Sequence, residues 1–155
     1  MKIVITYGTF DLFHVGHVRL LERLSSLGDK LIVGISTDDF NSLKGKESFF
    51  SYAERKEIVE SCKYVDFVFP EESWEQKVDD IKKYEASIFA IGDDWKGKFD
   101  YLNEYCEVEY LTRTANISTT DIRTSLSKFK DKELDGIETS LHEVIAIVRN
   151  LSSKN

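Results

Sequence analysis

The sequence has little of what builds secreted, fibrous or membrane-spanning proteins. Its 155 residues include two cysteines, one proline and eight glycines, so neither a disulfide framework nor a proline- or glycine-rich segment is expected. Cys62 and Cys106 form no C-x-x-C pair, and we interpret both as reduced thiols in or near the core. No apolar run approaches the roughly 20 residues of a membrane span, and no signal peptide is recognisable. We therefore expect a cytoplasmic protein without membrane insertion.

Positive charge is also scarce. The net charge is -7, from 28 acidic and 21 basic residues. Nucleic acid is therefore not expected as a partner, because nucleic-acid-binding proteins usually carry a basic face. A small anionic ligand is still allowed, since it needs only local positive charge. The length is that of one domain with a continuous core.

Strand-like and helix-like segments alternate along the chain. Strands are expected at residues 2–6, 30–36, 65–69 (ended by Pro70), 87–91 and 108–111. Helices are expected at 15–27, 52–62, 74–83 and from Ser118 or Thr119 to about 128, with residues 37–51 as a loop. Gly28 would stop the first helix, Ser51 would cap the second in a capping box with Glu54, and Ser73 would cap the third. This alternation predicts an α/β fold with a Rossmann-like, doubly wound parallel sheet of five strands. Ligands of such sheets bind at the carboxyl ends of the strands. The loops 7–17, 37–50, 92–98 and 112–120 are expected to converge there.

The C-terminal residues differ in pattern. Residues 129–136 are charged and are predicted to form a turn, and apolar residues then recur at helical spacing up to Leu151. We predict a main domain at 1–128 and an extension at 129–155. The extension would be an amphipathic helix that packs on the domain or on a dimer partner.

The turn after the first predicted strand holds Gly8, His14, Gly16 and His17. The backbone N–H groups at a helix start attract phosphate, and imidazoles add further donors. A metal site is a weaker interpretation, because the third histidine, His142, lies in the tail. Two loop histidines without a function are the remaining alternative.

The segment TYGTFDLFHVGH at 6–17 resembles the motif of the HxGH nucleotidyltransferases, and within them the cytidylyltransferases. Further motifs follow in the family's order, namely STD at 36–38, KGK at 44–46, YVD at 64–66, WEQK at 74–77, GDDW at 92–95, GKFD at 97–100, RT at 113–114 and ISTT at 117–120. The resemblance covers about residues 1–128, which makes chance an improbable explanation.

The resemblance implies transfer of a cytidylyl group from CTP to a phosphorylated acceptor. The expected acceptor is sn-glycerol 3-phosphate, and the products are then CDP-glycerol and pyrophosphate. The attacking phosphate oxygen is already an anion, so the reaction needs positioning and positive charge more than a strong base. The resemblance also implies Mg²⁺ held mainly by phosphate, a homodimer, and a route to a wall or capsule polymer such as teichoic acid.

The resemblance assigns roles to individual positions. The catalytic residues would be His14, His17, Lys44, Lys46 and Arg113. The nucleotide would also contact Thr9, Phe10, Asp94, Trp95, Thr114, Ser118, Thr119 and Thr120. The acceptor would contact Lys44, Lys77 and Arg55. Asp11 would orient a lysine, help to place Mg²⁺, or serve only as a structural turn residue.

Other functions fit the same motifs. The acceptor could be another polyol phosphate or phosphoethanolamine, the transferred group could be adenylyl, or the chain could be a nucleotide-binding regulator without turnover. Two stretches depart from the family pattern: residues 112–116 read TRTAN in place of PRTEG, and Lys63 replaces an arginine. Asn116 is expected to adopt a left-handed turn there.

Overall fold

The computed structural model describes residues 1–115 and 118–152. Two compact units divide the chain, Met1–Ile117 and Ser118–Asn155. The first unit contains one sheet, with strands β1 (Ile3–Gly8), β2 (Lys30–Ser36), β3 (Phe67–Glu71), β4 (Ile88–Gly92) and β5 (Glu107–Leu111). The strand order is β3-β2-β1-β4-β5, and every neighbouring pair is parallel. The predicted α/β fold with a Rossmann-like parallel sheet of five strands is confirmed.

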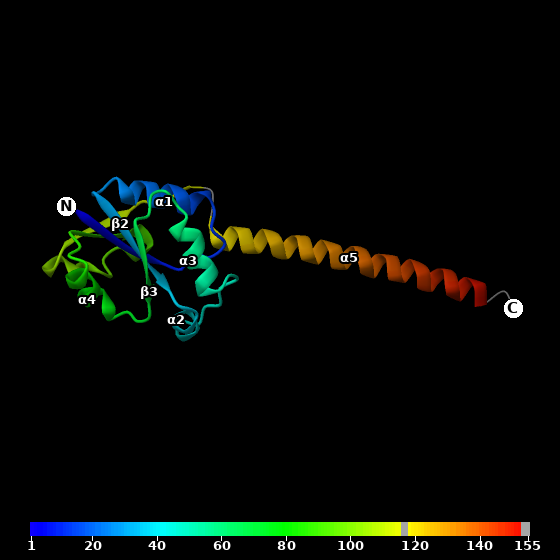
Figure 1. Ribbon diagram of the computed structural model, residues 1–155. Coiled ribbons are helices and arrows are strands. Elements are labelled where there is room, and N and C mark those ends of the chain that lie inside the picture. The colour runs from blue at the N-terminus through cyan, green and yellow to red at the C-terminus, as the bar shows by residue number, and fades with distance from the viewer. Residues whose placement is uncertain (116–117, 153–155) are drawn as a thin grey trace. The chain divides into compact units, whose positions relative to one another are not determined.

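Helices lie on both faces of the sheet (Figure 1). They are α1 (Val15–Ser25), α2 (Asp38–Leu43), α3 (Tyr52–Glu60) and α4 (Gln76–Lys83), followed by the short 3₁₀ helices η1 (Asp93–Trp95) and η2 (Asp100–Glu104). The predicted capping box of α3 is present: Ser51 Oγ accepts from the Glu54 N–H at 3.3 Å, and the Glu54 carboxylate accepts from the Ser51 N–H at 2.9 Å.

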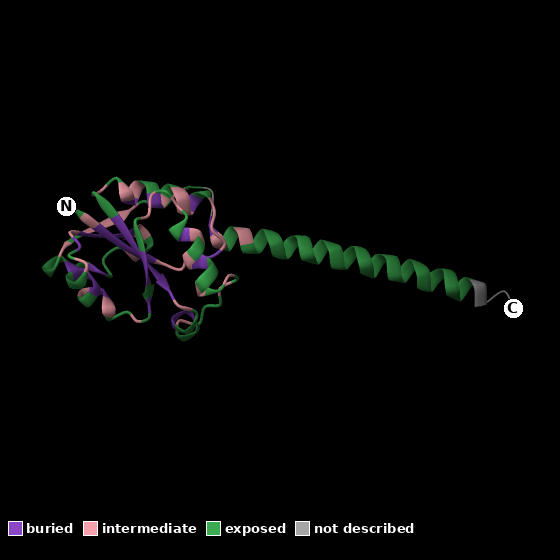
Figure 2. Ribbon diagram, viewed as in Figure 1, coloured by how far each residue is buried: buried purple, intermediate pink, exposed green. Residues whose placement is uncertain are grey.

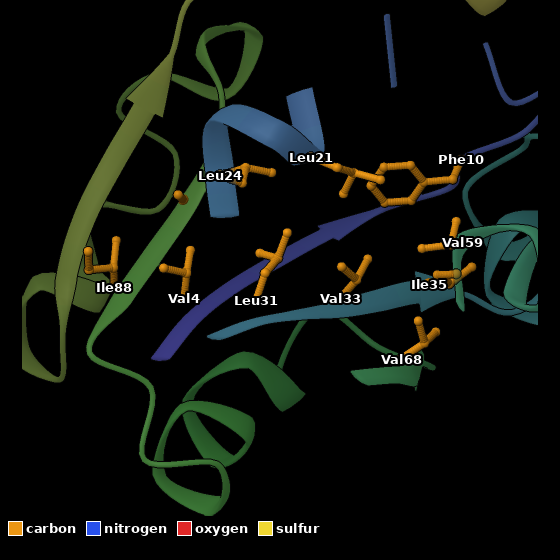
Figure 3. Close-up of a cluster of buried hydrophobic side chains, with 11 residues drawn as sticks. Val4, Phe10, Leu21, Leu24, Leu31, Val33, Ile35, Val59, Val68 and Ile88 are labelled. Carbon is orange, nitrogen blue, oxygen red and sulfur yellow. The ribbon is translucent and has the colours of Figure 1, made fainter. Parts of the chain in front are cut away.

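The core has one layer on each face of the sheet because successive side chains of a strand point to opposite sides. Val4 of β1 belongs to the first layer, where Leu21 and Leu24 of α1 point onto the strands (Figure 3). Ile5 belongs to the second layer, together with Ile81 of α4. Each such side chain, fully buried, contributes about 1.5–3 kcal/mol of hydrophobic free energy. The two layers fix β1 at the centre of the unit.

The central position of β1 creates the binding edge. The chain first adds β2 and β3 on one side of β1, and then crosses over to add β4 and β5 on the other side. The crevice at such a reversal, outside the carboxyl ends of the strands, is where ligands of open α/β sheets bind. The loops that follow β1 and β4 therefore border the candidate site.

The third strand does not end where the sequence predicts. It runs through Pro70, which pairs with Ile35, as far as Glu71. Because β3 lies at the edge of the sheet, the missing N–H of proline can face away from the ladder. The correction matters for function, since it places Glu71 at the carboxyl end of a strand.

Two helix starts also differ from the prediction. The expected loop at 37–51 contains α2, whose cap is Thr37: its Oγ1 accepts from the Phe40 N–H at 3.2 Å. A helix of six residues is too short to show a period in the sequence. Helix α4 starts later than predicted, and Ser73 does not cap it. Gln76 instead makes the side-chain hydrogen bonds at this end of the helix: its Oε1 accepts from the backbone N–H groups of Glu72 and Ser73.

Gly28 has a different role from the predicted helix stop. Helix α1 ends at Ser25, and a Cβ at Gly28 would lie 2.6 Å from the backbone oxygen of Lys2. Only glycine permits this close approach of the loop to β1.

The second unit is the single helix α5 (Thr119–Ser152) of 34 residues. Ser118 is its cap, as predicted, with Oγ accepting from the Asp121 N–H at 3.1 Å. The turn predicted at 129–136 is wrong, because the helix runs through that segment and through the predicted domain boundary at 128. The lysines and glutamates there are good helix formers, and Gly136 costs only about 1 kcal/mol. Figure 2 shows α5 exposed over residues 123–150, with partly buried residues near its start.

Candidate active site

The turn after β1 is held in an uncommon backbone conformation. Phe10 has a φ of 52° although its side chain is buried in the core. A Cβ at Gly8 would lie 2.8 Å from the Phe10 ring, so glycine at this position lets the ring fold back under the turn. Left-handed non-glycine residues cost about 1–3 kcal/mol and are concentrated at functional sites.

His14 and His17 stabilise the start of α1 together. His14 is the N-cap, and its Nδ1 accepts from the Gly16 N–H at 3.0 Å. The Nδ1 of His17 accepts from the His14 N–H at 3.1 Å, and the two ring centroids lie 4.0 Å apart. This is a capping box in which imidazoles replace the usual hydroxyl and carboxylate.

The two imidazoles are neutral at pH 7. Burial lowers the pKa of His14. Burial, helped by the neighbouring His14 and opposed by Asp11, lowers the pKa of His17 to about 4. Because each Nδ1 accepts a backbone N–H, the proton of each neutral ring lies on Nε2. Both histidines are therefore N–H donors through Nε2, which suits a phosphate at the helix start.

Asp11 connects this turn to the lysine loop. Its side chain is buried, and its two carboxylate oxygens accept from the backbone N–H groups of Phe49 at 2.7 Å and Phe50 at 3.0 Å. The loop that carries Lys44 and Lys46 is therefore anchored at its C-terminal end by the turn that carries the histidines. Asp11 therefore has a structural role, and its predicted contacts with a lysine or Mg²⁺ stay predictions.

A cavity of about 480 Å³ opens beside the turn. Its walls are Tyr7, Gly8, Thr9, Lys44, Lys46, Glu71, Trp74, Lys77, Ile91, Trp95 and Phe99. They come from the end of β1 and the turn after it, from the ends of β3 and β4, and from the loop after α2. The segment between β3 and α4, α4 itself, η1 and the segment before η2 supply the others. The carboxyl edge of the sheet thus gathers Thr9, Lys44, Lys46, Lys77 and Trp95, all predicted from the sequence as site residues.

Lys44 is the lysine of the loop that is most enclosed. Its Nζ lies 4.2 Å from the centre of the Phe40 ring and 5.4 Å from that of Trp74. Burial lowers the pKa of its ammonium group, an effect that Glu71 opposes and Lys46 reinforces. A phosphate that enters the cavity would meet two lysines held close enough to influence each other.

Lys77 is fully buried, and the exposed helix lysine that its position on the sequence could suggest is excluded. Its Nζ donates to Oε1 of Glu71 at 2.6 Å, and both side chains are nearly inaccessible to solvent. The ammonium group also faces three rings, with centroids at 4.4 Å for Tyr7, 4.8 Å for Trp74 and 5.5 Å for Phe99. One end of the cavity is therefore an aromatic cage that contains an ion pair.

The cage is itself supported by buried hydrogen bonds. The Tyr7 hydroxyl donates to Oδ2 of Asp80 at 2.9 Å, and Nε2 of Gln76 donates to the same oxygen at 2.8 Å. Burial, with Asp80 next, raises the pKa of Tyr7 far above its ordinary value, so the phenol stays protonated. These bonds fix the Tyr7 ring against Lys77.

Arg55 does not reach the cavity, and the predicted contact with the acceptor is corrected to a structural role. Its side chain is completely buried. Its guanidinium donates to the carbonyl oxygens of Thr9 at 2.9 Å, Ser36 at 2.7 Å and Phe50 at 3.0 Å, and to the Asp38 carboxylate at 2.8 Å. Arg55 therefore ties the ends of β1 and β2 to the lysine loop.

Several other predicted residues lie outside the cavity wall. Asp94 and Arg113 are exposed, Thr114 is partly buried, and Phe10 is a core residue beneath the turn. Ser118, Thr119 and Thr120 belong to the second unit, and Asn116, with its expected left-handed turn, lies outside the described residues. The contacts predicted for these residues with nucleotide remain predictions.

The two departures from the family pattern have local partners. Thr112, where the family has proline, accepts from Arg23 through its carbonyl oxygen at 2.6 Å and its hydroxyl at 3.2 Å. Lys63 places its Nζ 4.9 Å from the centre of the Tyr64 ring.

Reasoning from the sequence assigned no site role to Tyr7, Glu71, Trp74 and Phe99, which form the cage, or to Asp80, which supports it. Tyr7 ends the first strand, which is a usable signal at a ligand-binding edge. Glu71 was hidden by the expectation that Pro70 stops the strand. Asp80 looks like any acid on an exposed helix, and only the packing of α4 against β1 brings it to Tyr7.

Among the described residues, no three His, Cys, Asp or Glu side chains are grouped to hold a metal ion. A site with few protein carboxylates fits a Mg²⁺ ion that arrives with the phosphates of a nucleotide. Bound Mg²⁺ commonly keeps several waters and takes only one or two protein carboxylates. Asp11 supplies the carboxylate of the turn that bears the histidines. Within the part of the chain that the structure describes, no helix is long and apolar enough to span a bilayer.

Known proteins resemble the chain over about four-fifths of its length. Glycerol-3-phosphate cytidylyltransferase from Bacillus spizizenii is 61% identical over 127 residues, which cover 82% of this chain and 98% of the relative. The enzyme of the same name from Staphylococcus aureus is 53% identical over 126 residues, covering 81% and 96%. Both relatives are covered almost completely, although about a fifth of this chain has no counterpart in them.

Solved structures share the fold. The crystal structure of the lipopolysaccharide core biosynthesis protein from Thermoplasma volcanium has a TM-score of 0.65 and 23% identity, covering 74% of this chain and 98% of the other. At this identity the likeness concerns the fold alone. The family model described as cytidylyltransferase-like matches residues 5–125, which include β1, the histidine turn, the lysine loop and the cavity. The chain belongs to the cytidylyltransferase-like family.

Proposed function

We propose that the chain transfers the cytidylyl group of CTP to sn-glycerol 3-phosphate, which gives CDP-glycerol and pyrophosphate. The observation that carries the proposal is the cavity at the switch point of the sheet. There, Lys44 and Lys46 meet the buried Lys77 beside a turn with two neutral histidines. The names of the relatives that are 61% and 53% identical support the same reaction.

The reaction is an in-line displacement at phosphorus. An oxygen of the acceptor phosphate forms a bond with the α-phosphorus of CTP, while the bond from that phosphorus to the bridging oxygen of the β-phosphate breaks. The electron pair leaves with pyrophosphate. No proton has to be removed from the nucleophile, since the phosphate oxygen is already anionic. The protein must therefore hold two anions together and stabilise the charge that develops between them.

The residues of the site divide this work. The Nε2–H groups of His14 and His17 would donate to the triphosphate at the start of α1. Lys44 and Lys46 would neutralise the acceptor phosphate and the α-phosphate, which otherwise repel each other. A neutral imidazole suits this role because it donates without requiring a low pH. Arg113, Thr114 and the start of α5 would hold the distal phosphates, as the family resemblance implies.

Mg²⁺ is proposed as a companion of the nucleotide. Bound by the phosphates, it would withdraw charge from the leaving pyrophosphate. Asp11 is the candidate protein ligand, in addition to its bonds to the lysine loop.

The proposal includes a homodimer in the cytoplasm, which supplies CDP-glycerol for a wall or capsule polymer such as teichoic acid. Support for self-association comes from α5, where apolar side chains that are each at least 45% exposed recur from Leu126 to Val148. A periodic apolar stripe on a helix of 34 residues is typical of a coiled-coil partner surface.

Pyrophosphate release tests the proposed reaction. The protein is incubated with CTP or ATP, Mg²⁺ and one of three acceptors: glycerol 3-phosphate, another polyol phosphate, or phosphoethanolamine. Release with CTP and glycerol 3-phosphate is expected to exceed every other combination. If none of the acceptors supports pyrophosphate release, the enzymatic proposal is overturned in favour of a regulator. If only phosphoethanolamine supports release, the proposed acceptor is overturned.

A further inference from the structure

The buried end of the cavity has the composition of a site for an organic cation. Three aromatic faces, from Tyr7, Trp74 and Phe99, surround a position that also touches the carboxylate of Glu71. Aromatic cages with a carboxylate recognise ligands that carry an ammonium group. In this protein the position is already taken by the Nζ of Lys77.

The occupant is held firmly. The Lys77–Glu71 ion pair is 2.6 Å long, and the two side chains are 1% and 4% exposed. A bound ligand cation would have to displace Lys77 from the carboxylate, and this would leave an ammonium group buried without its counter-ion. Removing one partner of a buried ion pair is strongly unfavourable, because it leaves a buried charge uncompensated. A second cation beside Lys77 would be repelled by it.

We propose that Lys77 is a built-in ammonium group that fills the cage and restricts the acceptor to phosphorylated polyols that carry no positive charge. The inference rests on the proposed function, and it assigns the choice between polyol and alkylammonium acceptors to one side chain. The filled cage still suits hydroxyl groups. The Lys77 ammonium is a donor, and the Glu71 carboxylate has lone pairs beyond the one that it shares with Lys77.

Two rings of the cage are held by contacts that do not involve Lys77. Tyr7 is fixed by its bond to Asp80, and Trp74 packs against Phe40 and Trp95 with centroids at 5.4 and 5.5 Å. Shortening Lys77 is therefore expected to leave the rings in place. The vacated position would be lined by aromatic faces and by the Glu71 carboxylate, which would have lost its ion pair with Lys77.

The test compares acceptors in the wild type and in Lys77→Ala. In the wild type, kcat/KM for glycerol 3-phosphate is expected to exceed that for phosphoethanolamine by more than about 100-fold. In Lys77→Ala the ratio of phosphoethanolamine to glycerol 3-phosphate is expected to rise at least about 10-fold, in line with the cost of one unpaired buried charge. Ethylammonium chloride should also raise the melting temperature of this variant more than sodium chloride at equal concentration.

A second variant protects the test against misfolding. Lys77→Ala/Glu71→Gln opens the cage without leaving an unpaired buried carboxylate, and a smaller rise of the ratio is expected from the three rings alone. Lys77→Arg keeps a cation in place and should show no rise. If the wild type transfers to glycerol 3-phosphate but neither cage-opening variant changes the ratio, the inference is overturned. If the wild type transfers to no acceptor, it is the proposed function that fails.

Discussion

The backbone N–H of His14 donates to Nδ1 of His17 at 3.1 Å, and this bond determines which nitrogen of the His17 ring carries the proton. It closes the capping box at the start of α1 and places the proton of the neutral His17 ring on Nε2. The same side chain therefore stabilises the helix and offers a donor to phosphate. Mutations at His17 must separate these two roles.

Two different replacements of His17 distinguish its role in capping the helix from its role as a donor to phosphate. His17→Ala is expected to lose about 1 kcal/mol of helix-capping free energy and to lower kcat by about 10²–10³-fold, as for other lost transition-state donors. His17→Gln keeps an acceptor that can reach the His14 N–H, so its stability should be near that of the wild type while kcat remains low. Thermal melts and steady-state kinetics on the three proteins measure both effects. Recovery of kcat in His17→Gln would identify His17 as a structural residue only.

The lowered pKa of His17 predicts how stability depends on pH. The folded-state pKa is about 4, against 6.5 for an unperturbed imidazole. Between these values the unfolded chain binds more protons than the folded protein, so the free energy of unfolding decreases as the pH falls from about 6.5 to about 4. Urea midpoints at pH 7, 5.5 and 4.5 measure this slope. His17→Gln should have a shallower slope over the same range, and equal slopes for the two proteins would contradict the assignment.

Asp11 is predicted to act on the lysine loop through Phe49 and Phe50. Asp11→Ala removes the acceptor for two backbone N–H groups and should raise KM for the acceptor and speed proteolysis within residues 44–50. Asp11→Asn keeps one side-chain oxygen and should show about half of the proteolytic effect. If Asp11 also binds Mg²⁺, both variants will require more Mg²⁺ for half-maximal rate. A Mg²⁺ dependence equal to that of the wild type would confine Asp11 to its structural role.

Arg55 is predicted to stabilise the fold more than any exposed charged residue does. Arg55→Met leaves the carbonyl groups of Thr9, Ser36 and Phe50 without their donor, and each unsatisfied buried group costs about 1–3 kcal/mol. A loss of more than about 3 kcal/mol in the free energy of unfolding is expected from urea titration. Lys56→Met is the matched control, since Lys56 forms an exposed pair with Glu60, and it should change stability by less than about 0.5 kcal/mol. Similar losses in the two variants would contradict the proposed tie.

Helix α5 is predicted to carry the contact between two copies of the chain. Ile137 and Leu141 belong to its apolar stripe and are 59% and 57% exposed. Changing both to aspartate should convert the homodimer to a monomer in size-exclusion chromatography with light scattering. Thr139→Asp adds one charge on the opposite side of the helix and should leave the mass unchanged. A dimer that survives the double substitution would place the interface elsewhere, and a monomeric wild type would refute the homodimer itself.

The agreement between sequence and structure is closest where a local pattern is sufficient. The second strand was predicted at residues 30–36 and lies there. A continuous apolar run is typical of a strand that is covered on both faces in a parallel sheet. The caps Ser51 and Ser118 were also found from the sequence. The end of β3 and the continuity of α5 were missed, since an edge position for Pro70 and tolerance of Gly136 within a helix are not visible in the residues themselves.

The sequence by itself determined the fold class and the histidine turn, because hydrophobic periodicity and a motif of contiguous residues are local properties. It also named five of the eleven residues that line the cavity. Only the tertiary structure decided what Lys77 and Arg55 do. Both are long cations on helices that follow each other in the chain, and both are fully buried. Packing turned Arg55 toward backbone carbonyls beneath the lysine loop and Lys77 toward a carboxylate and three rings inside the cavity. Contacts between residues far apart in the chain, which no local pattern encodes, set these partners.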